Sequence, residues 1–195
     1  MHSGKFPTEQ GIVIDNLTFN VAQLLKEPVG ATRTGDVTAD LGRLVPELQQ
    51  AEDAPVAVLS GSVRLMHIND GILAQGMLHT QVMLPCARCL DPVRVPLDVE
   101  LEEIFVPTIN IITGKSIVPE EEDRALWIDE KHILDLHEVL RQDVMLASPI
   151  HVLCREDCQG LCPTCGQNLN ESPCDCQPEP DQRWAVLAAL LKDSE

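Results

Sequence analysis

The chain is short and strongly acidic, which limits both its architecture and its partners. Its 195 residues suffice for one ordinary domain with a small appendage, and 44% of them are hydrophobic. With three Phe, two Trp and no Tyr, the core must be built from Val, Leu and Ile. Lysine and arginine number 14 against 31 acidic residues, a formal net charge of −17. This charge argues against gripping nucleic acid over a broad surface and favours a basic partner.

Neither a membrane span nor an export signal is apparent in the sequence. The longest apolar stretch, around residues 185–191, is far shorter than the roughly 20 residues that a spanning helix needs. The first ten residues contain no apolar segment of the kind found in secretory signals. We therefore expect a cytoplasmic protein, whose eight cysteines are metal ligands or redox thiols rather than disulfides.

The N-terminal part of the chain predicts one short helix and then a weak strand. Asn20 is a candidate N-cap, Gln23 stands at the third helical position, and Pro28 ends the helix early. Residues 30–40 are small and polar and are compatible with a strand.

The middle of the chain has the clearest strand pattern. Val56–His67 forms one run, Asn69-Asp70-Gly71 predicts a tight hairpin turn, and Ile72–Leu84 runs back. From Val93 to Leu101 apolar and polar residues alternate, as expected of a strand with one buried face. Pro96 within this run indicates an edge or a bulge. Three consecutive antiparallel strands form a meander, which weaker strands could curl into a barrel or sandwich.

An acidic stretch follows the meander. Asp98–Asp123 carries eight acidic residues and one base, Lys115. Its middle, between Pro107 and Pro119, has no clear period and predicts a long surface loop. Such a charge run is typical of a solvated connector, and the functional alternative is a docking surface for a basic partner.

Two further helices are expected. Asp135 and Glu138 resemble a capping box, Leu134 and Val139 resemble a hydrophobic staple, and Pro149 ends the first helix. Its apolar stripe consists of Leu136, Val139, Leu140 and Val144. The last helix begins near Asp181, and its apolar face consists of Trp184, Leu187, Ala188 and Leu191.

Together these elements predict an α+β fold. An antiparallel β-meander curls into a small barrel or sandwich, with two or three flanking helices and a C-terminal cysteine-rich zinc knuckle. The β-rich body spans residues 11–106, the acidic connector residues 107–128, and the helix, zinc-binding knot and closing helix residues 129–195. We expect these three parts to form one integrated domain.

The cysteines fall into groups that suit a metal ion. Cys86 and Cys89 form a C-x-x-C motif, which offers two thiolates from a tight turn. Cys162-Pro163-Thr164-Cys165-Gly166 is the kind of turn that zinc ribbons use. The simplest partition places Cys162, Cys165, Cys174 and Cys176 on one zinc ion, and Cys86, Cys89, Cys154 and Cys158 on a second. The sequence leaves open whether one ion or two ions bind.

Other roles for these residues are weaker. Cys86 and Cys89 could form a thioredoxin-like dithiol, but Leu90-Asp91-Pro92 is a turn where that motif needs a helix. His151 could replace one ligand, although a loop histidine is the simpler interpretation. All-cysteine zinc sites are closed, whereas catalytic zinc keeps an open position, and the sequence has no nucleophile elbow or phosphate-binding glycine loop. We predict that the protein is not an enzyme.

Several motifs resemble those of the YceD family, also called DUF177. They are Cys86-Ala87-Arg88-Cys89-Leu90, Leu134-Asp135-Leu136, the stretch Leu153–Asn170, and Cys174-Asp175-Cys176. The resemblance runs from about Phe19 onward. It implies a bacterial cytoplasmic protein linked to the accumulation of large-subunit (23S) ribosomal RNA. It further implies that metal is a stabilising device, and it supplies no catalytic residues.

The acidic charge and the implied link to ribosomal RNA lead to two hypotheses. In the first, the protein is an adaptor for a basic ribosomal protein or a large-subunit assembly factor. The docking candidates are Glu100, Glu102 and Glu103. In the second, the protein binds 23S rRNA precursor directly through arginines near the zinc sites. These are Arg88, Arg94 and Arg155. A nuclease would need a carboxylate–metal site, and the spacing of the acidic residues in the sequence does not indicate one.

Overall fold

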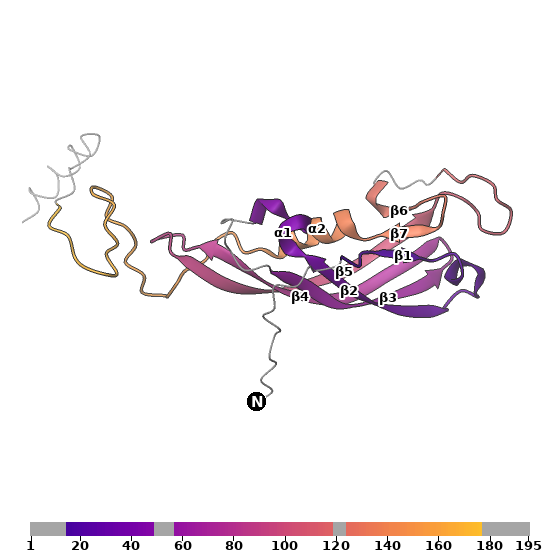
Figure 1. The fold of residues 1–195 in the computed structure, drawn as a ribbon, viewed down its shortest axis with the longest axis horizontal. Coiled ribbons are helices and arrows are strands. Elements are labelled where there is room, and N and C mark those ends of the chain that lie inside the picture. Colours follow the sequence, from indigo (N-terminus) through magenta and orange to yellow (C-terminus); the bar gives the residue numbers. More distant parts are fainter. Residues whose placement is uncertain (1–14, 49–56, 119–123, 177–195) are drawn as a thin grey trace, which may run out of the picture. The chain divides into compact units, whose positions relative to one another are not determined.

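A computed structural model describes residues 15–48, 57–118 and 124–176 (Figure 1). The predicted closing helix near Asp181 lies outside these residues. The chain divides into two compact units. Unit 1 holds the chain up to Leu84 together with Arg94–Ile150, and unit 2 holds Pro85–Val93 and the chain from His151 onward. The predicted α+β class is confirmed.

Unit 1 contains a curled five-stranded sheet with the order β2-β3-β4-β5-β6 (Figure 1). The strands are β2 Thr32–Asp40, β3 Val58–Ile68, β4 Gly71–Pro85, β5 Pro92–Pro107 and β6 Trp127–Ile128. β3 pairs antiparallel with both β2 and β4. The predicted run of three long strands is thus confirmed, and the weak strand signal over residues 30–40 corresponds to β2. The sheet is a half-barrel rather than a sandwich.

The connector contributes a strand that the sequence analysis missed. β6 pairs in parallel with the end of β5, where Val106 lies opposite Trp127. The loop between them contains a bridge from Ile109 to Ser116, so it is partly structured. Two residues are too few to show a period of two. The sequence therefore does not predict β6, and its residues fall in the segment predicted to be a connector.

A two-stranded sheet accompanies the half-barrel. β1 (Thr18–Asn20) pairs antiparallel with β7 (Ile133–Asp135), and Phe19 lies opposite Leu134. The helix predicted from Asn20 is therefore wrong: only a 3-10 turn, η1 (Leu24–Lys26), forms. The Asn20 side chain still accepts a hydrogen bond from the Ala22 N–H at 3.1 Å. Strand pairing before this segment and a proline after it leave too few residues for an α-helix.

Helices cover one face of the five-stranded sheet (Figure 1). They are α1 (Leu41–Leu44), which follows β2, and α2 (His137–Ala147). The remaining 3-10 turns are η2 (Pro46–Leu48) and η3 (Arg124–Leu126). Among the described residues, no helix is long and apolar enough to cross a membrane.

The apolar stripe of α2 is as predicted, but its cap is not. Leu136, Val139, Leu140 and Val144 are all buried. The Asp135 carboxylate accepts the N–H of His137 at 2.9 Å. Glu138 does not reach back to close a capping box, because its carboxylate binds the Arg141 guanidinium at 2.8 and 2.9 Å.

Aliphatic side chains and the Phe105 ring fill the core of unit 1 over its described residues. Phe105 of β5 is fully buried, together with Leu59, Ile72 and Leu78 of the neighbouring strands. On β5 the buried residues alternate with exposed ones, so the strand has one covered and one open face. The Val/Leu/Ile core expected from the composition is confirmed.

Candidate metal centres

The structure brings the eight cysteines together in two groups of four, both within unit 2. The first group is Cys86, Cys89, Cys154 and Cys158, and the second is Cys162, Cys165, Cys174 and Cys176. Within each group all the sulfur atoms lie within 4.8 Å of one another. These are the two sets that the simplest partition of the sequence gives. His151, the predicted alternative ligand, belongs to neither set.

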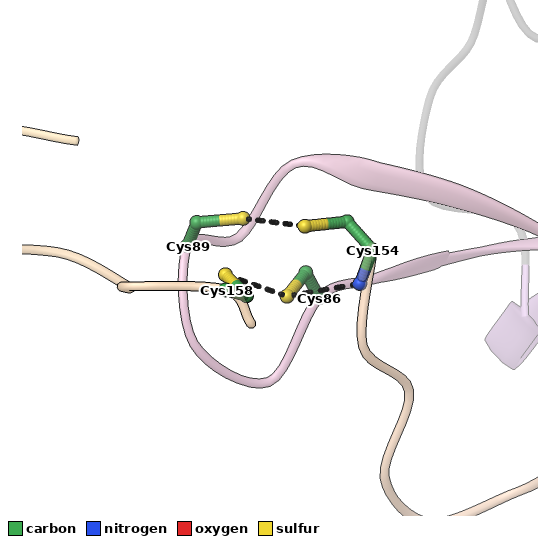
Figure 2. A group of neighbouring side chains, drawn as sticks. All are labelled: Cys86, Cys89, Cys154 and Cys158. Atoms are coloured by element: carbon green, nitrogen blue, oxygen red, sulfur yellow. Dashed lines mark hydrogen bonds between the residues drawn. The ribbon is translucent and has the colours of Figure 1, made fainter. Parts of the chain in front are cut away.

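Figure 2 shows the first centre, in which two segments of chain contribute two thiols each. The sulfur of Cys86 lies 3.8 Å from that of Cys158, and the sulfur of Cys89 lies 3.6 Å from that of Cys154. A zinc ion at about 2.3 Å from four tetrahedral sulfurs would separate them by about 3.8 Å. The spacing therefore fits one such ion.

The two C-x-x-C turns have the same backbone hydrogen bonds. The amide of the first cysteine donates to a carbonyl five residues later: Cys86 to Asp91 and Cys162 to Gln167, both at 2.8 Å. The first cysteine's carbonyl accepts the N–H four residues later, at 3.0 Å in the first turn and 2.9 Å in the second. These turns, hereafter knuckle 1 (residues 86–91) and knuckle 2 (residues 162–167), are built alike.

Backbone amides in both knuckles point at the first sulfur. The Cys86 sulfur accepts the N–H of Arg88 at 3.5 Å, and the Cys162 sulfur accepts the N–H of Thr164 at 3.4 Å. Such donors stabilise a thiolate, because they place positive charge at the sulfur. A thiolate is the form of cysteine that binds a metal.

The pKa values of the thiols follow from these contacts. The backbone N–H groups of Cys89 and Arg88 lower the pKa of Cys86 to about 6, and those of Cys165 and Thr164 lower the pKa of Cys162 to about 6. Burial raises the pKa of Cys89. Each knuckle thus holds one thiol that ionises readily, and a metal would displace protons from the others.

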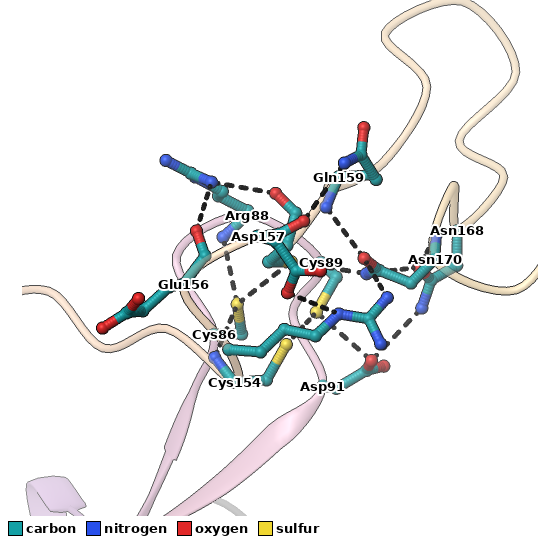
Figure 3. Close-up of polar contacts among 12 residues, drawn as sticks. Cys86, Arg88, Cys89, Asp91, Cys154, Glu156, Asp157, Gln159, Asn168 and Asn170 are labelled. Atoms are coloured by element: carbon teal, nitrogen blue, oxygen red, sulfur yellow. Dashed lines mark hydrogen bonds and ion pairs between the residues drawn. The ribbon is translucent and has the colours of Figure 1, made fainter.

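Side-chain amides complete the surroundings of the first centre (Figure 3). The Asn170 amide donates to the Cys158 sulfur at 3.3 Å and lowers the pKa of that thiol. The Asn168 amide donates at 3.2 Å to the Asp91 carboxylate, which also accepts from the Cys89 thiol at 3.2 Å. The sequence does not predict a role for either asparagine, because their distance along the chain from the cysteines of the first centre does not indicate that the chain folds back to it.

Two of the three predicted arginines are engaged in hydrogen bonds around the first centre. Arg88 donates to the backbone carbonyl of Cys158 at 2.9 Å, and Arg155 donates to the Asn170 side chain at 2.7 Å. Both guanidinium groups therefore hold the loop around the first centre. Arg94 is an exposed residue of β5 and belongs to unit 1.

The three predicted docking glutamates do not share one face of β5. Glu100 and Glu102 are exposed on the open face, where Asp98 also lies, and Asp98 accepts from His79 of β4 at 2.6 Å. Glu103 falls on the covered face because side chains alternate along a strand, and it is half-buried. The acidic surface of the open face is thus Asp98, Glu100 and Glu102.

Comparisons with known proteins agree with the motifs. The sequence model of the family described as "Large ribosomal RNA subunit accumulation protein YceD" matches residues 74–191. An uncharacterized protein of Mycobacterium tuberculosis is 31% identical over 185 residues, which cover 95% of this chain and 86% of that protein. No solved structure matches.

Two more distant relatives are also similar. The chloroplastic protein of Zea mays named large ribosomal RNA subunit accumulation protein YCED homolog 1 is 25% identical over 179 residues, 79% of this chain and 60% of that protein. The uncharacterized protein YlbN of Bacillus subtilis is 27% identical over 119 residues, 59% of this chain and 63% of that protein. The family predicted from the cysteine motifs is confirmed, and the chain belongs to the YceD family of large ribosomal RNA subunit accumulation proteins.

Proposed function

We propose that this protein is a non-enzymatic cytoplasmic factor that supports the accumulation of large-subunit (23S) ribosomal RNA. It acts as an acidic adaptor for a basic ribosomal or assembly protein, and each cysteine centre holds one structural zinc ion. The family name supports the link to ribosomal RNA. The net charge of −17 carries the choice of a protein partner, because phosphate contact requires clustered basic residues.

The construction of unit 2 supports a structural role for zinc. Its described buried apolar side chains are chiefly cysteines: Cys86, Cys89 and Cys158 pack together, with only Val93 and Leu161 against them. An apolar cluster of this size cannot offset the entropy of ordering the surrounding loops. Zinc would cross-link four chain positions at each centre, and its binding free energy would become folding free energy.

Zinc fits the donor set at both centres. Four sulfurs without histidine or carboxylate suit a tetrahedral, closed site, in which no position is left for substrate. Metal analysis of the purified protein tests this assignment, and two zinc ions per chain are expected. A chain that retains no metal after purification in zinc-supplemented buffer would contradict the zinc assignment.

The adaptor role is supported by where the charges lie. Asp98, Glu100 and Glu102 follow one another along the open face of β5, while Arg88 and Arg155 are engaged in hydrogen bonds within unit 2. A row of carboxylates attracts a basic partner over roughly one Debye length, about 8 Å at physiological salt. Binding should therefore weaken as salt is raised.

A pull-down of the tagged protein from cell lysate, with and without nuclease, separates the two modes of action. The adaptor proposal expects a basic ribosomal or assembly protein that survives nuclease and is lost at high salt. Recovery of 23S precursor RNA alone, with every protein lost on nuclease treatment, would instead show direct RNA binding.

Charge reversal then maps the surface. Glu100→Lys with Glu102→Lys should weaken capture of the basic protein at least tenfold. Glu130→Lys with Glu171→Lys changes the net charge equally at two exposed residues outside β5 and serves as the control. Equal weakening by both pairs would show that the net charge, and not the β5 surface, determines binding.

Depletion of the protein tests the role in the cell. The ratio of 23S to 16S ribosomal RNA should fall, and the wild-type gene should restore it. An unchanged ratio would refute the role in rRNA accumulation whatever the outcome of the metal and partner experiments.

A further inference from the structure

Residues 160–169, which follow the last cysteine of the first centre, form a short hairpin. Leu161 and Asn168 face each other in an antiparallel bridge, and the Leu169 N–H donates to the Gly160 carbonyl at 2.9 Å. Knuckle 2 is the tip of this hairpin, because the Cys162 N–H donates to the Gln167 carbonyl inside the bridge. The position of the hairpin thus depends on knuckle 2.

The base of the hairpin is fastened to knuckle 1. The Leu161 N–H donates to the Arg88 carbonyl at 3.1 Å. Gly160 has a left-handed φ of 75°, and a Cβ there would lie 3.1 Å from the Arg88 carbonyl oxygen. This close approach and backbone conformation are what glycine tolerates best. The two strands of the hairpin are therefore built against the first centre.

Asn170 sits where the return strand reaches the first centre (Figure 3). Its side-chain oxygen Oδ1 accepts the backbone N–H of Gln159 at 2.8 Å and the Arg155 guanidinium at 2.7 Å. Its amide donates to the Cys158 sulfur at 3.3 Å and to the Asn168 side chain at 2.9 Å. One side chain thus joins both hairpin strands to a ligand of the first centre.

The same asparagine lies between ligands of the second centre. It follows Cys165 and precedes Cys174, so a metal held by these two cysteines would restrain both ends of its segment. Ordering that segment fixes the amide beside the Cys158 sulfur. An outer-shell hydrogen bond of this kind alters metal affinity by about 10-fold to 100-fold.

We infer that the two centres bind metal cooperatively and that Asn170 is the positioning residue that couples them. Metal at the second centre raises the affinity of the first, and by thermodynamic linkage metal at the first raises the affinity of the second by the same factor. This inference rests on the proposal that both centres bind metal.

The coupling is measured with Co²⁺ as the probe on the full chain, using its thiolate absorption and a competing chelator. Cys89→Ser with Cys154→Ser leaves the second centre alone, and Cys174→Ser with Cys176→Ser leaves the first alone. The coupling factor is the product of the two association constants in the unaltered protein, divided by the product of the constants of the two single-centre variants.

A coupling factor between about 10 and 100 is expected in the series with wild-type Asn170. In the Asn170→Ala series it should fall to within about threefold of unity, because the link to Cys158 is gone. Asn170→Asp keeps the acceptor oxygen but loses the amide donor, and it should behave like Asn170→Ala. The control is Glu171→Ala, at an exposed residue beside Asn170 in the same segment, which should leave the factor unchanged.

The possible outcomes distinguish the coupling inference from the proposal that both centres bind zinc. Two bound ions with a coupling factor near one, or with coupling that survives Asn170→Ala, overturn the inference and leave the zinc proposal intact. Wild-type coupling in Asn170→Asp shows that the amide donor is not the carrier. Absence of bound metal at either centre overturns both the inference and the structural role of zinc.

Discussion

Leu90 and Gly166 occupy the same position in the two knuckles, and both have a left-handed backbone, with φ of 65° and 74°. Each donates its N–H to the carbonyl of the first cysteine of its knuckle. Glycine adopts this conformation without cost, whereas a leucine pays about 1–2 kcal/mol for it. Knuckle 1 therefore stores strain that knuckle 2 does not.

Leu90→Gly should stabilise the metal-loaded protein by about 0.5–1 kcal/mol, since relief of strain exceeds the added freedom of glycine in the unfolded chain. Little apolar burial is lost, because Leu90 is 63% exposed. Denaturant unfolding with metal in excess measures the change. Gly166→Ala is the opposite substitution and should destabilise. A less stable Leu90→Gly protein would mean that the leucine side chain makes a contact that outweighs the strain.

Removal of one ligand should empty its own centre, while the other centre still binds zinc with an affinity lowered by the coupling factor. Cys162→Ser should lower the bound zinc from two ions per chain to about one, because a zinc site with three cysteines loses most of its affinity. Zinc analysis after dialysis against a weak chelator measures the stoichiometry. Cys162 is not a ligand if the variant retains two ions.

Asp143 should make stability fall as pH rises. One carboxylate oxygen of Asp143 is buried and has no hydrogen-bond partner among the residues that the structure describes. Burial, with the nearby Glu103 carboxylate, raises the pKa of Asp143 to about 6. The pKa of an unfolded aspartate is about 3.9. The protonated form thus stabilises the fold fully below about pH 4, and this contribution is lost as pH rises through about 6.

Asp143→Asn should accordingly be more stable than the wild type by about 1–2 kcal/mol at pH 7.5, with no difference near pH 4. This range is reduced from the full shift because the side chain is only partly buried. Urea unfolding at both pH values measures the change. Asp70→Asn, in the exposed turn between β3 and β4, is the control. A pH-independent gain would point to packing instead of charge.

Gly71, at the start of β4, should tolerate no side chain. A Cβ at this position would collide with the backbone carbonyl of Phe105 on β5. Gly71→Ala should destabilise unit 1 by about 2 kcal/mol or more, because the backbones of β4 and β5 would have to move apart at this point. Gly114→Ala is the control: no atom lies within 4 Å of its Cβ, so only its left-handed φ of 67° is penalised. Equal losses in thermal unfolding would show that the contact with Phe105 is unimportant.

The local patterns of the sequence determined the long elements and the grouping of the cysteines. Alternation of apolar residues over Val93–Leu101 predicted β5, and the apolar stripe beginning at Leu136 predicted α2. These signals are reliable because they repeat over many residues, and each repeat adds buried apolar area on the same face. The two C-x-x-C turns could also be predicted, because in each turn the two sulfurs belong to a segment of only four residues.

Tertiary structure alone decided the short strands, the failed helix after Asn20 and the surroundings of the first centre. β1, β6 and β7 have no more than three residues each, so their pairing depends on partners far along the chain. Asn170 reaches the Cys158 sulfur, and Glu103 faces Asp143, only because the chain folds back. Such contacts depend on where distant segments meet, and that is set by packing and hydrogen bonding rather than by the spacing of residues within one segment.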